Sequence, residues 1–310
     1  MTDKKGFPPT ILMIRPVRFG YNQQTAVNNA FQSAPDHSES EEHIQAAALK
    51  EFDHFVKQLQ EVGIPLLIIQ DTDHPHTPDS IFPNNWMTTH ADGRVVLFPM
   101  FAENRRLERK DSVIRTVEEQ FKTEDMIDLS VYESENRFLE GTGSFILDRE
   151  HRIAYACLSP RTDEQLFRTF CAQLNFQPIV FRANDTRGIP IYHTNVMMCV
   201  ADQYAVINLQ SIDSKDRENV ARTLKKSGKT VIEITQEQMD AFAGNMLQLF
   251  NKELQPYLVM STQAYHSLNH EQIKLLESFN PILHVPIDTI ERHGGGSARC
   301  MMAELFLSPK

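Results

Sequence analysis

Residues 293–310 read HGGGSARCMMAELFLSPK and end the chain with three consecutive glycines, a cysteine and an apolar segment. The segment ARCMMAELFL predicts a strand that has no partner among its neighbours in the sequence. The first predicted strand of the chain, TILMIRPV, is the candidate partner. Pairing the last strand with the first would complete a unit of the fold and remove a free sheet edge.

Between these two strands the same order of elements recurs, namely strand, strand, helix, strand. The first unit contains NNWMTTH, RVVLFPM, an amphipathic helix carrying Val113, Val117 and Phe121, and DMIDLSVY. The later units supply the strands GSFILD, RIAYACL and PIVFRA, then TNVMMCVA, YAVINL and TVIEI, then NMLQLFN, YLVMST and ILHVPI. With the closing pair this makes five units in 310 residues, or about 62 residues each. Such a period predicts units that are stacked or arranged radially around an axis.

One polar or reactive residue stands at the entry to the first strand of each unit. Successive members of this set are 52 to 55 residues apart: Asn85, Glu140, His193, Asn245 and Cys300. If the repeat is radial, all five positions point toward one central cavity. A thiol, an imidazole, a carboxylate and two amides would then converge although they are far apart in the sequence.

This combination suits attack on a planar carbon that carries nitrogen leaving groups. Cysteine attacks as a thiolate, and histidine takes and returns a proton. Glutamate either fixes the tautomer of the histidine or accepts hydrogen bonds from substrate nitrogens. Taken singly, Cys300 could be a buried structural thiol, His193 a core histidine, and each asparagine a cap or turn residue. The register of the whole set, rather than any one member, indicates a site.

The composition narrows the class of protein. The net charge of −10 argues against a nucleic-acid-binding or anionic-membrane surface, since both need a basic patch. The four cysteines contain no C-x-x-C pair, so we expect reduced thiols and a cytoplasmic protein. The His and Cys spacing matches no zinc signature, and we expect neither metal nor cofactor. The apolar run near the start of the chain is too short for a signal peptide. No window of about 18 apolar residues exists, so we expect no membrane-spanning helix.

Five segments resemble motifs of the guanidine-modifying (pentein) superfamily: FPNNW, LEGTGS, YHTNVMMCV, AGNMLQL and HGGGSARCMMAEL. Its members include arginine deiminases, dimethylarginine hydrolases, agmatine deiminases and glycine amidinotransferases. The chain most resembles the citrulline-utilisation hydrolases, also called amidinotransferase-like proteins, and MIRPVRFGYN adds to that likeness. The resemblance spans nearly the whole chain. It implies one catalytic α/β domain over residues 1–310, a five-bladed α/β propeller of ββαβ units with pseudo-fivefold symmetry.

The resemblance also implies roles for individual residues. Cys300 would be the nucleophile, His193 the general acid/base and Glu140 its polar partner. For the α-carboxylate of an amino-acid substrate we expect Arg18 first, with Arg299 and Arg187 behind it. The other expected substrate contacts are amides: Asn22, Asn84, Asn85, Asn195 and Asn245.

Two departures from the superfamily pattern bear on the substrate. Asn84-Asn85 and Asn195 stand where arginine-processing members usually carry acidic residues. Because a buried guanidinium needs carboxylate partners, the sequence predicts a neutral ureido group, with citrulline converted to ornithine, ammonia and carbon dioxide. The alternatives are a hydrolase of arginine, dimethylarginine or agmatine, an amidinotransferase, and a non-catalytic propeller that binds another macromolecule. A homodimer is compatible with the sequence.

Overall fold

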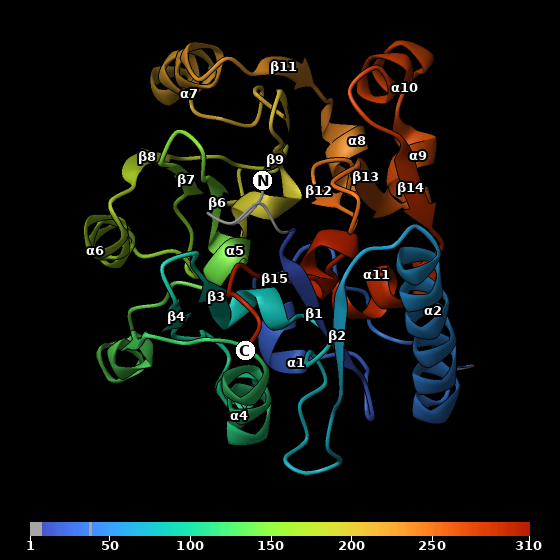
Figure 1. The fold of residues 1–310 in the computed structure, drawn as a ribbon. Helices are drawn as coiled ribbons and strands as arrows, with labels where there is room; N and C mark the ends of the chain where they lie inside the picture. Colours follow the sequence, from blue (N-terminus) through green and yellow to red (C-terminus); the bar gives the residue numbers. More distant parts are fainter. Residues whose placement is uncertain (1–7, 37–38) are drawn as a thin grey trace.

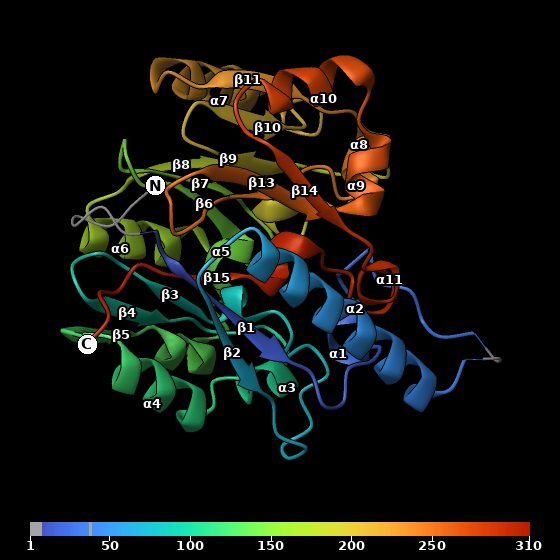
Figure 2. The same cartoon turned by 45° about the vertical axis from the view of Figure 1, so that its right-hand side comes forward.

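The computed structural model describes residues 8–36 and 39–310, and in these residues the strands form five sheets of three strands each. In every sheet the middle strand pairs antiparallel with one neighbour and parallel with the other. Figure 1 shows the sheets around a common centre, with the longer helices on the outside. Figure 2, which is turned by 45° from that view, shows the same sheets and helices, and the predicted α/β repeat is present.

Each sheet takes its antiparallel strand, its middle strand and its parallel strand from one unit. In this spatial order the strands are β15 (Ala303–Leu305), β1 (Thr10–Arg15) and β2 (Leu66–Gln70); β3 (Met87–Thr89), β4 (Arg94–Leu97) and β5 (Asp125–Asp128); β6 (Phe145–Asp148), β7 (Ile153–Cys157) and β8 (Gln177–Phe181); β9 (Met198–Val200), β10 (Tyr204–Ile207) and β11 (Thr230–Glu233); β12 (Leu247–Phe250), β13 (Pro256–Ser261) and β14 (Ile282–Val285).

Helices connect the two parallel strands of each sheet, as in a βαβ unit. In chain order these connecting helices are α2 (Glu41–Glu61), α4 (Asp111–Gln120), α6 (Glu164–Leu174), α7 (Ser214–Lys226) and the pair α9 (Thr262–Ser267) and α10 (His270–Glu277). Shorter helices lie in the connecting segments: α1 (Gln23–Ala26), α3 (Glu103–Arg106), α5 (Gly141–Ser144), α8 (Gln236–Asp240) and α11 (Asp288–Gly294).

Helix α2 is an amphipathic helix whose two ends are explained by its sequence. The Ser40 side chain accepts a hydrogen bond from the backbone N–H of His43 and so caps the first turn. The buried face carries Ile44, Ala48, Phe52, Phe55 and Leu59, which recur every three or four residues. Gly63 follows the helix with φ of +81°, a conformation that ends helices readily only with glycine.

The last strand pairs with the first, as the terminal segment predicts. Strand β15 runs antiparallel to β1, with Thr10 opposite Leu305 and Leu12 opposite Ala303. Strand β2 pairs with the other side of β1 in parallel. The fifth unit is therefore assembled from both ends of the chain.

The first strand of each unit lies toward the centre in Figure 1. Strand β15 contacts β3, and β9 contacts both β6 and β12. These inner strands are shorter than the sequence predicts, since the beginnings of NNWMTTH, GSFILD, TNVMMCVA and ARCMMAELFL are not extended. A short helix precedes β6, and single 3-10 turns precede β3, β9 and β15. The tight turn before each of these inner strands directs its polar residue toward the centre.

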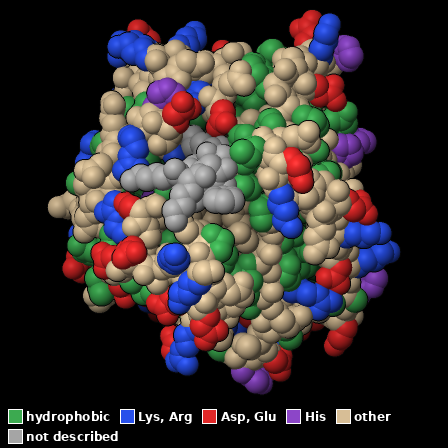
Figure 3. All heavy atoms as spheres, in the orientation of Figure 1, with side chains coloured by type: hydrophobic (Ala, Val, Ile, Leu, Met, Phe, Trp, Pro, Cys, Tyr) green, Lys and Arg blue, Asp and Glu red, His purple; other side chains and the backbone are tan. Residues whose placement is uncertain are grey.

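The hydrophobic core fills the space between the sheets and the outer helices. One cluster packs Phe145 of β6 against Phe167 and Phe170 of α6, with the Phe145 and Phe170 rings stacked at 4.6 Å. On the face drawn in Figure 3, acidic and basic side chains are interspersed rather than gathered by sign. Among the described residues, no helix is both long and apolar enough to span a bilayer.

Candidate active site

The five polar residues in register lie in the turns that precede the inner strands. Asn85 ends a 3-10 turn before β3, and Glu140 and His193 are the N-cap residues of the turns before β6 and β9. Asn245 stands two residues before β12, and Cys300 lies in the 3-10 turn Ala298–Met301 before β15. None of the five side chains is more than 3% exposed. The repeat therefore brings all five into the interior.

Two glycines allow the close packing of these turns. A Cβ on Gly143 would lie 2.4 Å from Asn85 Nδ2 and 2.7 Å from His193 Nδ1. Gly295, in the glycine run, has φ of +63°, and a Cβ there would lie 2.5 Å from Asn29 Nδ2. All three distances are far below van der Waals contact, so only glycine fits at these two positions without a shift of the neighbouring atoms. The glycine run thus allows the loop that carries Asn29 to pack closely against the segment that leads to Cys300.

His193 and Glu140 form a buried pair. His193 Nε2 lies 2.7 Å from Glu140 Oε2. Burial lowers the pKa of His193 to about 4, against the attraction of Glu140. Burial opposes ionisation of Glu140 too, but Arg161, His193 and Arg105 together hold the pKa of that carboxyl below its usual value. An ionised carboxylate only accepts, so a neutral His193 donates its Nε2–H and keeps a lone pair on Nδ1.

Cys300 receives two amide donors. Asn195 Nδ2 and Asn245 Nδ2 each lie 3.3 Å from Cys300 Sγ. Asn245 also donates to the backbone oxygen of Asn195 and accepts from the backbone N–H of Arg299, so its orientation is fixed. The backbone N–H of Cys300 donates to the backbone oxygen of Ser297 at 2.9 Å. Fixed N–H donors stabilise negative charge on the atom they face.

Cys300, His193 and Asn85 line one small cavity, which we call the Cys300 cavity. Its other polar walls include Asp79, Arg105, Arg161 and Tyr192. The free volume is about 10 Å³, enough for about one water molecule. The thiol and the imidazole thus share a cavity that has to widen before it can admit a substrate.

Two of these residues are buried arginines that sequence reasoning missed. Arg105 forms a bidentate pair with Glu108 at 2.8 and 3.0 Å and donates to Asn85 Oδ1 at 2.9 Å. Arg161 donates to Asn28 Oδ1 and to the backbone oxygen of Thr25. Both arginines stand in polar loop sequence, where no periodic pattern distinguishes a buried residue from an exposed one.

Asp79 was also missed, and it leaves a free acceptor in the cavity wall. Asp79 Oδ2 accepts from Asn22 Nδ2 at 2.7 Å, whereas its Oδ1 is buried without a hydrogen-bond partner among the described residues. Three amide atoms of the predicted set are buried and unpartnered as well: Asn84 Oδ1, Asn85 Nδ2 and Asn195 Oδ1. Buried polar atoms are normally paired, so these four atoms indicate where a ligand could bind.

The arginines predicted to hold a carboxylate lie elsewhere. Arg18 is exposed, with Nε 3.7 Å from Asp73, and does not line the Cys300 cavity. Arg187 is exposed and paired with Asp185 at 2.7 Å. Arg299 is buried, but its guanidinium donates to Met302 and Glu304 on β15 and lines a different cavity. The structure therefore brings none of these three guanidiniums to the Cys300 cavity.

The two remaining predicted amides, Asn84 and Asn22, contact residues around the centre. Asn84 donates to Thr142 Oγ1 at 3.3 Å, which links the turn before β3 to helix α5. Asn22 caps α1 and reaches the cavity only through its bond to Asp79. In the part of the chain that the structure describes, no group of three or more His, Cys, Asp or Glu side chains could hold a metal ion.

Comparisons with known proteins identify the family and the fold. The sequence matches the family described as N,N dimethylarginine dimethylhydrolase, eukaryotic, over residues 15–307. A search of curated protein sequences finds no match.

Solved structures share the fold at low sequence identity. Apo ArgZ, an arginine dihydrolase from the ornithine-ammonia cycle in cyanobacteria, superposes with a TM-score of 0.76 at 17% identity over 97% of this chain. That match covers 41% of ArgZ, so the chain spans about two fifths of the larger protein. A substrate-bound variant of the ArgZ N-terminal domain gives 0.75 at 17% identity, covering 96% of this chain and 98% of that one.

A dimethylarginine dimethylaminohydrolase, as an adduct with S-methyl-L-thiocitrulline, has a TM-score of 0.64 at 14% identity. The match covers 96% of this chain and 100% of that one. At these identities the likeness is one of fold, while the sequence match over residues 15–307 establishes the family. The chain belongs to the N,N-dimethylarginine dimethylhydrolase family of the guanidine-modifying superfamily, whose hydrolases act on carbon–nitrogen bonds other than peptide bonds.

Proposed function

We propose that the protein hydrolyses a carbon–nitrogen bond at a guanidino or ureido carbon through a covalent intermediate on Cys300. The observation that carries the proposal is that Cys300 and His193, which is hydrogen-bonded to Glu140, line one cavity. A thiol, a neutral imidazole with a free lone pair and a carboxylate that fixes its tautomer are the parts such a reaction needs.

In the first half of the reaction, His193 Nδ1 takes the proton of the Cys300 thiol. The sulfur forms a bond to the substrate carbon and gives a tetrahedral adduct. The protonated His193, stabilised by Glu140, then returns the proton to the departing nitrogen as the carbon–nitrogen bond breaks. The amine leaves, and the remaining carbon group is held as a thioester-like intermediate on Cys300.

In the second half, water replaces the amine in the cavity. His193 removes a proton from the water as the oxygen attacks the carbon, and the carbon–sulfur bond then breaks to release Cys300. A guanidino substrate yields a ureido product. A ureido substrate yields a carbamate, which loses carbon dioxide.

We propose an arginine-type guanidino compound as the substrate, and the buried carboxylates of the site support this choice. The inference of a neutral substrate assumed that asparagines had replaced the acidic residues of the site. Asp79 is nevertheless buried in the wall of the Cys300 cavity with its Oδ1 free of any partner among the described residues, and Glu140 is buried behind His193. Such acceptors suit a guanidinium, which only donates. The family match also favours this alternative over citrulline.

Citrulline remains a second candidate because of one specific atom. Asn85 Nδ2 is a buried donor without a partner among the described residues, and its orientation is fixed because Asn85 Oδ1 accepts from Arg105. A guanidinium offers no acceptor to this donor, whereas a ureido oxygen does. An amidinotransferase would need the same nucleophile and exclusion of water.

For the α-carboxylate we propose Arg161 in place of Arg18. Arg161 lines the Cys300 cavity, and its Nη1 has only a long contact of 3.5 Å with Glu140. This nitrogen is the least engaged donor of the two buried guanidiniums. A carboxylate would receive a charge-assisted hydrogen bond there.

We also propose that residues 1–310 form one catalytic domain, a five-bladed propeller with pseudo-fivefold symmetry. The five similar sheets and the closure of the last strand on the first support this view. The described cysteines are all unpaired, which supports a reducing, cytoplasmic location. A homodimer stays a proposal from the sequence.

The test is a product assay by mass spectrometry with arginine, dimethylarginine, citrulline and agmatine. We expect the highest kcat/KM for a guanidino amino acid and no turnover by Cys300→Ala. Preference for citrulline would select the second candidate, and no turnover of any compound would reject the enzymatic proposal. Arg161→Lys should raise KM for arginine about 10-fold or more but leave KM for agmatine, which lacks the α-carboxylate, nearly unchanged.

A further inference from the structure

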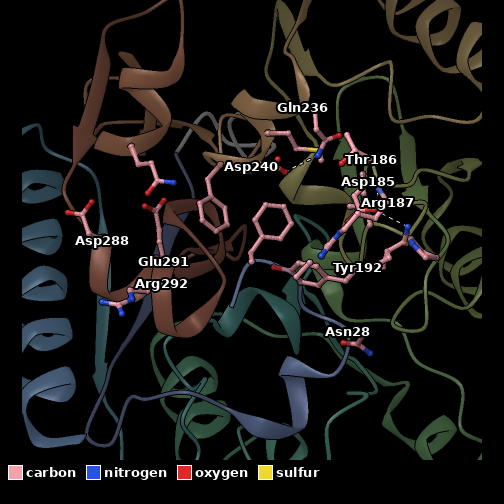
Figure 4. Close-up of a pocket in the computed structure, with 18 residues that line it drawn as sticks. Asn28, Asp185, Thr186, Arg187, Tyr192, Gln236, Asp240, Asp288, Glu291 and Arg292 are labelled. Atoms are coloured by element: carbon pink, nitrogen blue, oxygen red, sulfur yellow. Dashed lines mark hydrogen bonds and ion pairs between the residues drawn. The ribbon is translucent and has the colours of Figure 1, made fainter. Parts of the chain in front are cut away.

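A second and larger cavity lies beside the Cys300 cavity. Its volume is about 420 Å³, within the range of small-molecule sites. Tyr192 lines both cavities, but Cys300 and His193 do not line the larger one. Figure 4 shows Asp288, Glu291 and Arg292 on one side and Asp185, Arg187 and Tyr192 on the opposite side. We call this space the Glu291 cavity.

The charges in its wall leave an excess of carboxylates. Arg187 is neutralised by Asp185 at 2.7 Å, and Arg292 by Glu39 at 2.9 Å. Among the described wall residues, the carboxylates of Asp240, Asp288 and Glu291 remain without a cationic partner. The cavity is therefore suited to a cation rather than an anion.

Glu291 provides the independent observation that points to a ligand. Its side chain is 2% exposed, its Oε1 accepts from Ser297 Oγ, and its Oε2 has no hydrogen-bond partner among the described residues. Burial raises the pKa of Glu291 to about 7, although the neighbouring hydroxyls of Ser297 and Ser261 oppose the shift. A buried carboxylate oxygen without a donor is costly, and a bound cation would remove that cost.

Aromatic rings complete the wall. Phe31 lies 5.1 Å from Phe242 and 6.0 Å from Tyr192, measured between ring centroids. All three rings line the Glu291 cavity. Aromatic faces next to carboxylates attract organic ammonium groups through cation–π contacts as well as through charge.

We propose that the Glu291 cavity is a binding site for a small organic ammonium compound, an amino acid or diamine whose cationic group pairs with Glu291 Oε2. The site is separate from the reaction at Cys300 and does not depend on it. Glu291 is the buried anchor, while Asp240 and Asp288 lie at the exposed rim. A diamine long enough to span the cavity can pair with the anchor and the rim together.

The probe for the test is putrescine, which has two ammonium groups and neither a carboxylate nor a guanidino carbon. Its binding is measured by titration calorimetry, and 1,4-butanediol serves as the uncharged probe of equal length. We expect putrescine to bind the wild type with a submillimolar Kd and 1,4-butanediol not to bind. Glu291→Gln should weaken putrescine binding at least 10-fold, because glutamine can still accept from Ser297 but carries no charge.

Controls separate this cavity from the active site and from loss of folding. Cys300→Ala and the surface variant Glu277→Gln should keep the wild-type Kd within about 2-fold. Asp288→Asn, at the exposed rim, should weaken binding about 3-fold without changing the melting temperature. The proposal is overturned if the wild type does not bind putrescine at 10 mM, if folded Glu291→Gln binds as well as the wild type, or if Cys300→Ala abolishes binding.

Discussion

The centre of the ring and its apolar periphery hold the same residue type in different surroundings. Cys300 lies at the centre, whereas Cys157 and Cys171 lie farther out on β7 and α6, and all three are at most 3% exposed. Burial raises the pKa of the Cys157 and Cys171 thiols to about 12. Cys300 instead faces two amide donors and a cavity with charged walls. On the proposed mechanism, burial alone does not make a thiol inert, because the atoms that the sulfur faces decide its chemistry.

The largest expected effect tests this contrast directly. Cys300→Ala should lower kcat/KM by about 10⁴-fold or more, since it removes the proposed nucleophile. Cys171→Ala, on the outer helix α6, should keep kcat/KM within about 2-fold but lower the free energy of unfolding by about 1 kcal/mol. Steady-state kinetics and urea denaturation measure the two quantities. If Cys300→Ala retained a tenth of the activity, the contrast between centre and periphery would fail.

The next effect concerns the pH dependence of stability. Native His193 has a pKa of about 4, whereas an unfolded histidine titrates near 6.5, so the unfolded state binds more protons between these values. As pH falls from about 6.5 to 4, His193 should therefore cost the native state about 3 kcal/mol.

Urea denaturation of the wild type and of His193→Gln at several pH values isolates this contribution. The stability of the wild type relative to the variant should decline over that interval. His54→Gln, at the exposed surface of α2, is the matched control and should give a difference independent of pH. A flat profile for His193→Gln would mean that the central imidazole is not neutral when buried.

Glycine substitutions give a smaller effect that separates crowding from backbone strain. Gly143→Ala would force a methyl group against Asn85 and His193, so kcat/KM should fall about 100-fold. Gly228→Ala, after α7, meets no atom within 4 Å but has φ of +76°. It should cost about 1 kcal/mol of stability through strain and leave kcat/KM unchanged. Equal activities of the two variants would show that the turn at Gly143 does not position His193.

The smallest expected effect is at the surface. Arg18→Ala should change kcat and KM by less than about 2-fold, because Arg18 is exposed and lies outside the Cys300 cavity. Kinetics with arginine at two salt concentrations would check this. A large rise in KM would indicate that the loop bearing Arg18 closes over the substrate and would restore the original assignment.

Local sequence determined the repeat and its register. Strand and helix periodicity are properties of neighbouring residues, so the units and the position just before each inner strand could be read from the chain. Because each unit folds in the same way, Asn85, Glu140, His193, Asn245 and Cys300 occupy equivalent turns. The pairing of β15 with β1 followed from the one strand that was left without a partner.

Only the tertiary structure decided which charged side chains are buried beside these five residues. Arg161 and Asp79 lie in polar loops and Arg105 in the short polar helix α3, and nothing in the local sequence distinguishes them from the exposed Arg18. A charge is stable in the interior only where it finds partners, and these often come from distant segments, as when Arg161 contacts Asn28 and the backbone oxygen of Thr25. Such contacts depend on how the connecting segments fold over the centre. The preference of the site for a charged or a neutral substrate depends on the same contacts.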